Sequence, residues 1–295
     1  MVWLVASICL SVLLLVNFRL FGRFNVNTTL AVSLNYVVCF VTGFLLLPKG
    51  QKFELQFSEN WTWYCLLLGI GFVITFLLSG FSTKHAGITP TALANNLSLV
   101  IPVCISLFFL SGMGKVFDLM NYAGIGIAIL AMWFSAFRGS GEAFQKQKWW
   151  LPLGVFLMYG ITNSSINLLN AYYIPHPENT ISVMLVMVFG AMLAGLVLAG
   201  VQIMGQKKEL GRPTILAAFT LGVPNFLSFY FLIRALSYFG NSGAFVFPVY
   251  NMGLILLSAL VGMVFFKEKL QGSQGVGLLL GLLAIILLSH QEIGF

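Results

Sequence analysis

The chain has 295 residues, of which 59% are hydrophobic and 8% are charged. Soluble globular domains carry about 25% charged residues, so this composition excludes a soluble fold and is typical of an integral membrane protein. The formal net charge is +7, but the 15 Lys and Arg residues are scattered in ones and twos near the ends of apolar segments. Because they form no basic patch, we expect no nucleic-acid partner.

Apolar segments of about 20 residues, the length that crosses a bilayer, follow one another along nearly the whole chain. Ten are predicted as membrane helices: residues 2–21, 28–48, 61–81, 87–111, 118–137, 149–171, 179–204, 213–236, 241–266 and 271–290. The connections between them are too short for a separate soluble domain. The sequence therefore predicts an all-α integral membrane protein with a single membrane domain, whose function lies inside the helix bundle.

The sequence gives little support for metal, cofactor or catalytic chemistry. Its four cysteines lie inside apolar segments without CxxC spacing: Cys9, Cys39, Cys65 and Cys104. His85 and His176 lie in loops without neighbouring ligand clusters, so we expect no metal and no cofactor. The spans contain no Ser–Lys or Ser–His pair, no Asp pair and no HExxH motif, which disfavours an intramembrane enzyme.

Positive charges are unevenly distributed between successive loops. The odd-numbered loops hold 11 Lys and Arg residues, among them Arg19, Arg23 and Lys84, whereas the even-numbered loops hold four. Cytoplasmic loops carry the positive excess. We therefore predict a multi-pass protein of the cell (inner) membrane with both termini on the non-cytoplasmic side.

The two halves of the chain are related by a shift of 153 residues. This shift places residues 86–110 on residues 239–263 without a gap, and it matches helix lengths and small-residue positions more than identities. Residues 1–140 and 141–295 would then form two five-helix repeats. Because five is an odd number, the second repeat is inverted relative to the first, an arrangement typical of transporters with a site at the repeat interface.

Small residues one helical turn apart occur at matching places in the two halves. The shift takes Gly124 and Ala128 onto Gly277 and Gly281. In lipid, helices associate through close backbone approach, which such residues permit. We predict that these four residues form the packing seam between the halves.

Several motifs resemble the EamA-like branch of the drug/metabolite transporter superfamily. The ending FKEKLQGSQGVGLLLGLLAIILL at 266–288 is similar to that family's bulky residue, Glu and Gly-led last helix, and RALSYFGNSGAF at 234–245 and LVIPV at 99–103 are similar to its patterns around helices 3 to 4 and 8 to 9. The resemblance covers the whole chain and implies a ten-helix transporter. The chain departs from the family pattern at Lys115, where Glu is usual, whereas Glu268 is kept as an expected helix-end or ion-pair residue.

Uncharged polar side chains interrupt several predicted spans. Tyr159, Asn163 and Asn167 share one helix face by their spacing, and Asn95 and Ser98 share another. Such groups either hold helices together, at about 0.6–2 kcal/mol each, or line a water-filled cavity. Because so many of them are difficult to satisfy in a dry core, we predict a substrate cavity. Its predicted lining is Asn35, Asn95, Ser98, Tyr159, Asn163, Asn167, Asn225, Tyr250 and Asn251.

Prolines and charges complete the set of candidate functional residues. Pro102, Pro224 and Pro248 fall inside predicted spans, where they are either hinges of a gate or tolerated structural kinks. Arg234, near a helix end, is either an anchor at the lipid interface or an anion contact at a cavity mouth. All eight acidic residues fall in loops or at helix ends, so we expect no coupling through a mid-membrane carboxylate.

These features favour a secondary transporter that moves a small polar or amphipathic metabolite by alternating access. The family resemblance implies an amino acid or a related compound, with export as the expected direction. The expected partners are the small-molecule substrate and the lipid bilayer, and we expect a monomer or weak homodimer. A lipid or lipid-linked-sugar translocase is the alternative, and a non-transporting membrane scaffold is a second one.

Overall fold

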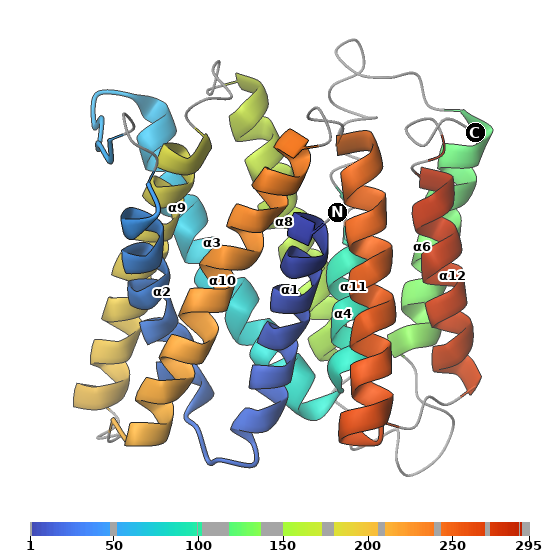
Figure 1. Ribbon diagram of the computed structural model, residues 1–295, viewed down its shortest axis with the longest axis horizontal. Helices are drawn as coiled ribbons and strands as arrows, with labels where there is room; N and C mark the ends of the chain where they lie inside the picture. Colours follow the sequence, from blue (N-terminus) through green and yellow to red (C-terminus); the bar gives the residue numbers. More distant parts are fainter. Residues whose placement is uncertain are drawn as a thin grey trace.

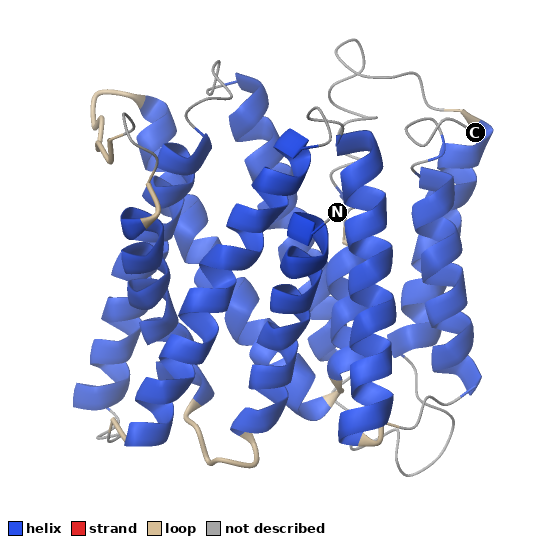
Figure 2. Cartoon of the chain, in the orientation of Figure 1, coloured by secondary structure: helices blue, strands red, loops and turns tan. Residues whose placement is uncertain are grey.

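Helices make up almost all of the computed structural model, which describes residues 2–47, 52–98, 100–101, 118–136, 150–172, 180–205, 210–238, 243–268, 272–288 and 290. They run side by side as one bundle, and the described residues contain no strand (Figures 1 and 2). In chain order the helices are α1 (Val2–Phe21), α2 (Thr28–Leu45), α3 (Asn60–His85), α4 (Ile88–Leu97), α6 (Leu119–Ala136), α8 (Trp150–Tyr172), α9 (Thr180–Gly200), the π-helix η2 (Val201–Gly205), α10 (Arg212–Tyr238), α11 (Gly243–Phe266) and α12 (Gly272–Leu288).

The described helices have the length and the surface of membrane spans. By length and composition, six are apolar enough to cross a bilayer: α1, α2, α3, α9 with η2, α10 and α11. Large apolar side chains on the outside, such as Leu45, Val197 and Phe265, are 69–77% exposed. Water would penalise such a surface, whereas lipid tails would not. The chain is therefore a multi-pass membrane protein.

Hydropathy predicted the helix ends closely, with two informative differences. The span predicted at 2–21 is α1, and the span predicted at 149–171 is α8 shifted by one residue. α3 continues to His85, beyond the predicted 81, because its polar last turn keeps helical hydrogen bonds where hydropathy has already fallen. Of the span predicted at 87–111, α4 covers 88–97 and ends where the Ser98 hydroxyl donates back to the Asn95 carbonyl and competes with helix continuation. Residues 100–101 are helical, and residues 102–111 lie outside the described residues.

Two apolar clusters organise the packing of the bundle. One draws residues from α1, α2, α3, α9 and α10, with Ala31, Val32 and Leu221 at its centre. The other draws residues from α4, α6, α8, α11 and α12, with Ala131, Val155 and Ala284 fully buried. α6 and α12 pack chiefly on each other at one edge of the bundle (Figure 1).

The start of α1 and the end of α12 lie toward the same end of the bundle in Figure 1. The connections at residues 22–27, 86–87 and 267–268 lie at the opposite end, which we call the basic end because Arg19, Arg23 and Lys84 are located there.

Candidate functional site

The predicted site residues Asn35 and Asn225 form a hydrogen bond between α2 and α10. The Asn225 amide nitrogen donates to Asn35 Oδ1 at 3.1 Å, and Asn35 Nδ2 donates to the Val32 carbonyl at 3.0 Å. The side chain of Asn35 is fully buried. Gly222 permits this approach, because a Cβ at that position would lie 2.6 Å from the Asn35 carbonyl oxygen. Two amides from different helices therefore share one polar spot inside the bundle.

A second group of polar contacts connects α8 to α3 and α4. Asn163 Nδ2 donates to Ser98 Oγ at 3.4 Å, and Ser79 Oγ donates to the Tyr159 hydroxyl at 3.5 Å. Asn95 is half-buried one turn before Ser98. The two hydrogen bonds are long for their type. Of the predicted residues, Ser98 and Asn163 are thus in direct contact, while Tyr159 contacts Ser79 of α3.

A third polar contact lies between α1 and α11. The hydroxyl groups of Ser11 and Tyr250 are 2.7 Å apart, and Ser7 Oγ donates to the Ser228 carbonyl of α10 at 2.6 Å. Asn251, next to Tyr250, is 7% exposed.

Sequence reasoning did not single out Ser7, Ser11 or Ser79 as site residues. An isolated Ser in an apolar helix is ordinarily satisfied by the carbonyl one turn earlier. The one available signal was the spacing of Ser7 and Ser11, which places both on one face of α1.

The three predicted hinge prolines and Asn167 differ in how far the structure describes them. Pro102 and the side chains of Asn167 and Pro248 lie outside the described residues. Pro224 is buried inside α10, which continues through it.

Arg234, the candidate anion contact, makes its contacts within its own helix. It is exposed, and its Nε and Nη2 atoms donate to the Tyr230 hydroxyl at 3.0 and 2.8 Å. Its guanidinium carbon also lies 5.3 Å from the centre of the Tyr230 ring. This local contact holds the guanidinium in one position.

The small residues named for the seam lie where α12 meets the first half of the chain. A Cβ on Gly124 would lie 3.0 Å from Leu288 Cγ, and a Cβ on Gly281 would lie 2.7 Å from Leu93 Cδ1 of α4. Ala128 is 1% exposed, and Gly277 is buried. Close helix contact therefore occurs at these positions.

Glu268 connects the end of α11 to the start of α4 at the basic end. Its carboxylate accepts hydrogen bonds from the Ile88 amide at 2.8 Å, the Thr89 amide at 3.4 Å and the Thr89 hydroxyl at 3.3 Å. Arg19 Nε lies 3.8 Å from the same carboxylate, whose side chain is 5% exposed. Glu268 was predicted as a helix-end or ion-pair residue, and it makes both contacts, with Arg19 of α1 as the ion-pair partner.

Two glycines make room for the Glu268 carboxylate. Gly87 precedes α4 with φ +112°, a conformation that favours glycine, and a Cβ there would lie 2.9 Å from Glu268 Oε1. A Cβ on Gly262 would lie 2.7 Å from Glu268 Oε2.

Asp118 and His290 form the other ion pair found among the described residues, at the opposite end of the bundle. Asp118 caps the start of α6, accepting from the Met120 and Asn121 amides at 2.9 and 3.1 Å, and its second oxygen lies 2.7 Å from His290 Nε2. The hydrogen bond between His290 Nδ1 and the Leu287 carbonyl, together with Asp118, raises the pKa of His290 above its usual range, although partial desolvation opposes this. No group of three or more His, Cys, Asp or Glu residues in the described part of the chain could hold a metal ion.

Comparison with known proteins finds one family that part of the chain resembles. Residues 169–290 match the EamA-like transporter family. The second half of the chain is therefore similar to this family. EamA-like proteins are transporters rather than enzymes.

Two other comparisons cover nearly the whole length of the chain. An uncharacterized protein of Haemophilus influenzae is 24% identical to this chain over 296 residues, covering 98% of this chain and 96% of that protein. A protein of known crystal structure shares 13% sequence identity and superposes with a TM-score of 0.52, with 97% of each chain covered. At that identity the second likeness concerns the fold alone.

Proposed function

We propose that this protein is a secondary transporter that exports a small polar or amphipathic metabolite, with an amino acid or related compound as the substrate class. The observation that carries the proposal is the match to the EamA-like transporter family. Polar, uncharged side chains on facing helices support it, because amide and hydroxyl groups can exchange their mutual hydrogen bonds for those of a polar solute. No mid-membrane carboxylate is required for such a substrate.

We propose further that transport proceeds by alternating access between inverted repeats, residues 1–140 and 141–295. The 153-residue shift supports this, because it carries α3 onto residues 213–238, and α10 spans Arg212–Tyr238. It likewise relates α1, α2, α4 and α6 to α8, α9, α11 and α12. Helix packing follows the same relation. α1 packs on α10 as α8 packs on α3, and α2 packs on α10 as α9 packs on α3.

The polar contacts also fall at related places in the two proposed repeats. Shifted by 153, Ser11 reaches position 164, beside Asn163, and Tyr250 reaches position 97, beside Ser98. The α1–α11 and α4–α8 contacts would thus be counterparts on the two sides of a central pathway. Opening one contact while the other stays closed is what alternating access requires.

Ligand binding and flux test this function. The purified protein is screened by thermal unfolding against amino acids, sugars, nucleotides, polyamines and lipophilic cations, since a ligand at about 100 times its Kd stabilises the fold by about 2.7 kcal/mol. Flux of the stabilising compound is then measured in proteoliposomes that contain the parent protein, the Asn163→Leu variant or the Asn95→Leu variant. The control is Ser165→Leu on α8, because the Ser165 hydroxyl bonds the Ile161 carbonyl of its own helix.

We expect both Asn variants to fold and to lose binding, while the Ser165 variant transports normally. Unaffected transport in both Asn variants would remove the cavity assignment. Stabilisation by added lipids alone would favour the lipid translocase instead. A C-terminal reporter that fluoresces only in the cytoplasm tests the proposed orientation, in which both termini lie on the non-cytoplasmic side of the inner membrane.

A further inference from the structure

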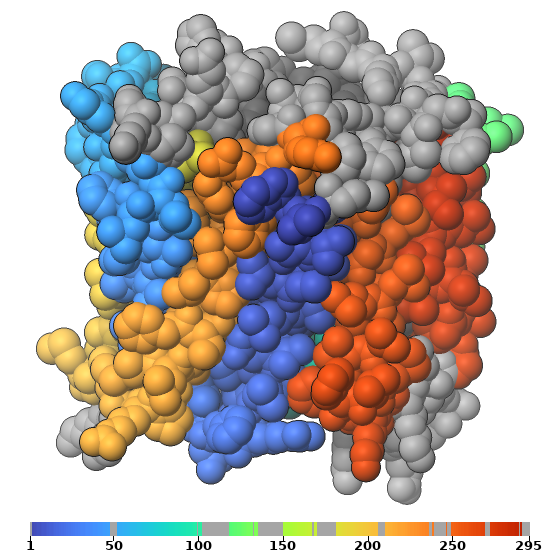
Figure 3. Space-filling view, viewed as in Figure 1, coloured from blue at the N-terminus to red at the C-terminus, as the bar shows by residue number. Residues whose placement is uncertain are grey.

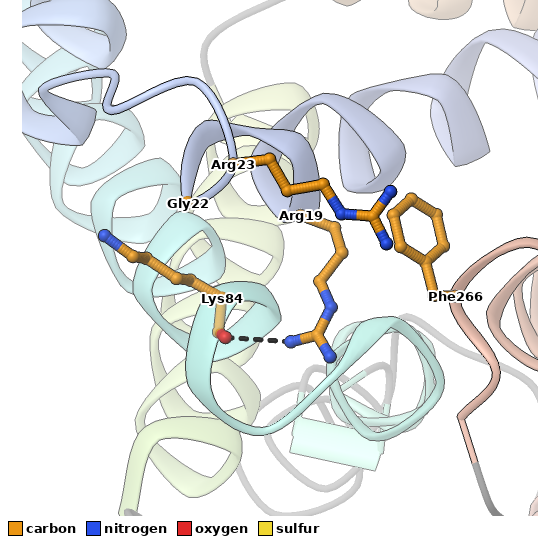
Figure 4. A pocket seen from close by; sticks show the side chains of 5 residues that line it. All are labelled: Arg19, Gly22, Arg23, Lys84 and Phe266. Carbon is orange, nitrogen blue, oxygen red and sulfur yellow. Dashed lines mark hydrogen bonds between the residues drawn. The ribbon is translucent and has the colours of Figure 1, made fainter.

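A hollow of about 270 Å³ opens at the basic end, where the ends of α1, α3 and α11 meet. Its lining residues are Arg19, Gly22, Arg23, Lys84 and Phe266, three of which are cationic (Figure 4). In Figure 4 the Arg23 guanidinium lies over the Phe266 ring, while Arg19 reaches toward the backbone of Lys84. The hollow therefore has a cationic lining with one aromatic wall.

The charge of this hollow is only partly balanced. Arg19 is held by the Thr83 and Lys84 carbonyls at 3.2 and 2.8 Å and pairs with Glu268. Glu268 is in turn engaged by the start of α4. Arg23 and Lys84 have no ion pair among the described residues, and Arg23 instead stacks 5.4 Å from the centre of the Phe266 ring. Within the part of the chain that the structure describes, two positive charges are thus left without a protein counter-charge.

The surroundings of the hollow indicate where its anion comes from. On α11, Val264 and Phe265, directly before Phe266, are 60% and 71% exposed, and Phe24, directly after Arg23, is 63% exposed. Figure 3 shows the ends of α1 and α11 side by side at the lower edge of the molecule. An anion at this place therefore has apolar surface beside it, as a phospholipid has acyl chains beside its phosphate.

We propose that this hollow binds the phosphate group of an anionic phospholipid of the adjoining leaflet, with Arg23 and Lys84 as its charge partners. Cationic side chains near an anionic leaflet contribute about 1 kcal/mol each, and basic pockets between membrane helices bind lipid headgroups. The stacking of Arg23 on Phe266 orients the guanidinium for the phosphate and lowers the entropy lost on binding. Simple interfacial anchors would need no hollow and would show no preference for these two positions over other cations at the same end.

Native mass spectrometry of the full chain in neutral detergent, with phosphatidylglycerol or phosphatidylcholine titrated, tests the site. Phosphatidylglycerol is expected to bind at one retained site and phosphatidylcholine is not. The double variant R23Q/K84Q should bind about 30-fold more weakly, from the loss of two such contacts. The matched control is R212Q, which removes an exposed cation at the same end and outside the hollow, and it should bind like the parent protein. If the double variant does not fold, the single variant K84Q replaces it, and its affinity for phosphatidylglycerol should be about fivefold lower than that of the parent protein.

Three outcomes would overturn the proposal. Unchanged phosphatidylglycerol binding in the folded double variant, or in K84Q where only that variant folds, would remove the site. An equal loss in R212Q would reduce the effect to overall surface charge. Displacement of the lipid by glycerol 1-phosphate at comparable concentration would mean that the hollow recognises a soluble phosphate instead.

Discussion

Removal of the Glu268 carboxylate should weaken the whole bundle at its basic end. Glu268→Ala leaves the Ile88 and Thr89 amides at the start of α4 without their acceptor, in a place where the side chain is 5% exposed and water cannot replace it. Hydrogen bonds to a charged group contribute about 1.5–3 kcal/mol. Arg19 is 29% exposed and keeps its two carbonyl partners, so its ion pair adds at most about 1 kcal/mol.

We therefore expect Glu268→Ala to lower the free energy of unfolding by about 2–4 kcal/mol. Equilibrium unfolding of the purified protein in mixed micelles with SDS measures this loss. Glu268→Gln keeps an oxygen acceptor but no charge, so its free energy of unfolding should fall by about half as much as that of Glu268→Ala. The matched control is Glu59→Ala, because Glu59 precedes α3 but is exposed and makes no capping hydrogen bond. That change should stay within about 0.5 kcal/mol.

The reasoning would be refuted by a Glu268→Ala loss no larger than that of Glu59→Ala. A full loss in Glu268→Gln would instead mean that charge, rather than hydrogen-bond acceptance, determines the contribution.

Three further predictions concern other parts of the bundle. Because the pKa of His290 is raised in the folded state, protonation of His290 stabilises the fold at pH values below its unfolded pKa of about 6.5, and this contribution is lost as the pH rises through the folded pKa. The free energies of unfolding of the parent protein and of His290→Gln should therefore converge at high pH. A difference that stays constant with pH would contradict this linkage. Gly69→Ala places a Cβ 2.3 Å from the Ala191 backbone nitrogen and should lower the free energy of unfolding by about 1–3 kcal/mol. Gly126→Ala, whose Cβ would have nothing within 4 Å, should leave that free energy unchanged or raise it in the same unfolding experiment. Arg234→Gln should weaken flux of a substrate with an acidic group more than that of a neutral one, while parallel losses of flux and protein level would mean an anchoring role.

The approximate position of most described helices was accessible from sequence, because lipid is a uniform apolar solvent. A helix satisfies its own backbone groups, so a run of apolar residues is sufficient to define a span. The bounds of α1 and α8 show this directly. The polar faces of α4 and α8 were also predictable, because spacing alone places residues on one side of a helix.

The partners of the polar residues were not accessible in the same way. Asn225 meets Asn35 across 190 residues of chain, and Glu268 meets the Ile88 amide across 180. Every Asn amide can bond to many groups with similar energy, so the residue type does not specify its neighbour. Hydropathy of the individual spans carries no record of which helix lies beside which.

The basic end shows most clearly which features the sequence determines and which depend on tertiary packing. Loop charges predicted that Arg19, Arg23 and Lys84 lie on one side of the membrane, since charged groups remain near the interface. Only tertiary packing decided that Arg19 is engaged by Glu268 while Arg23 and Lys84 are left beside a hollow. The physical reason is that local hydropathy determines the depth of a residue in the bilayer, whereas its electrostatic partners depend on helices brought together from distant parts of the chain.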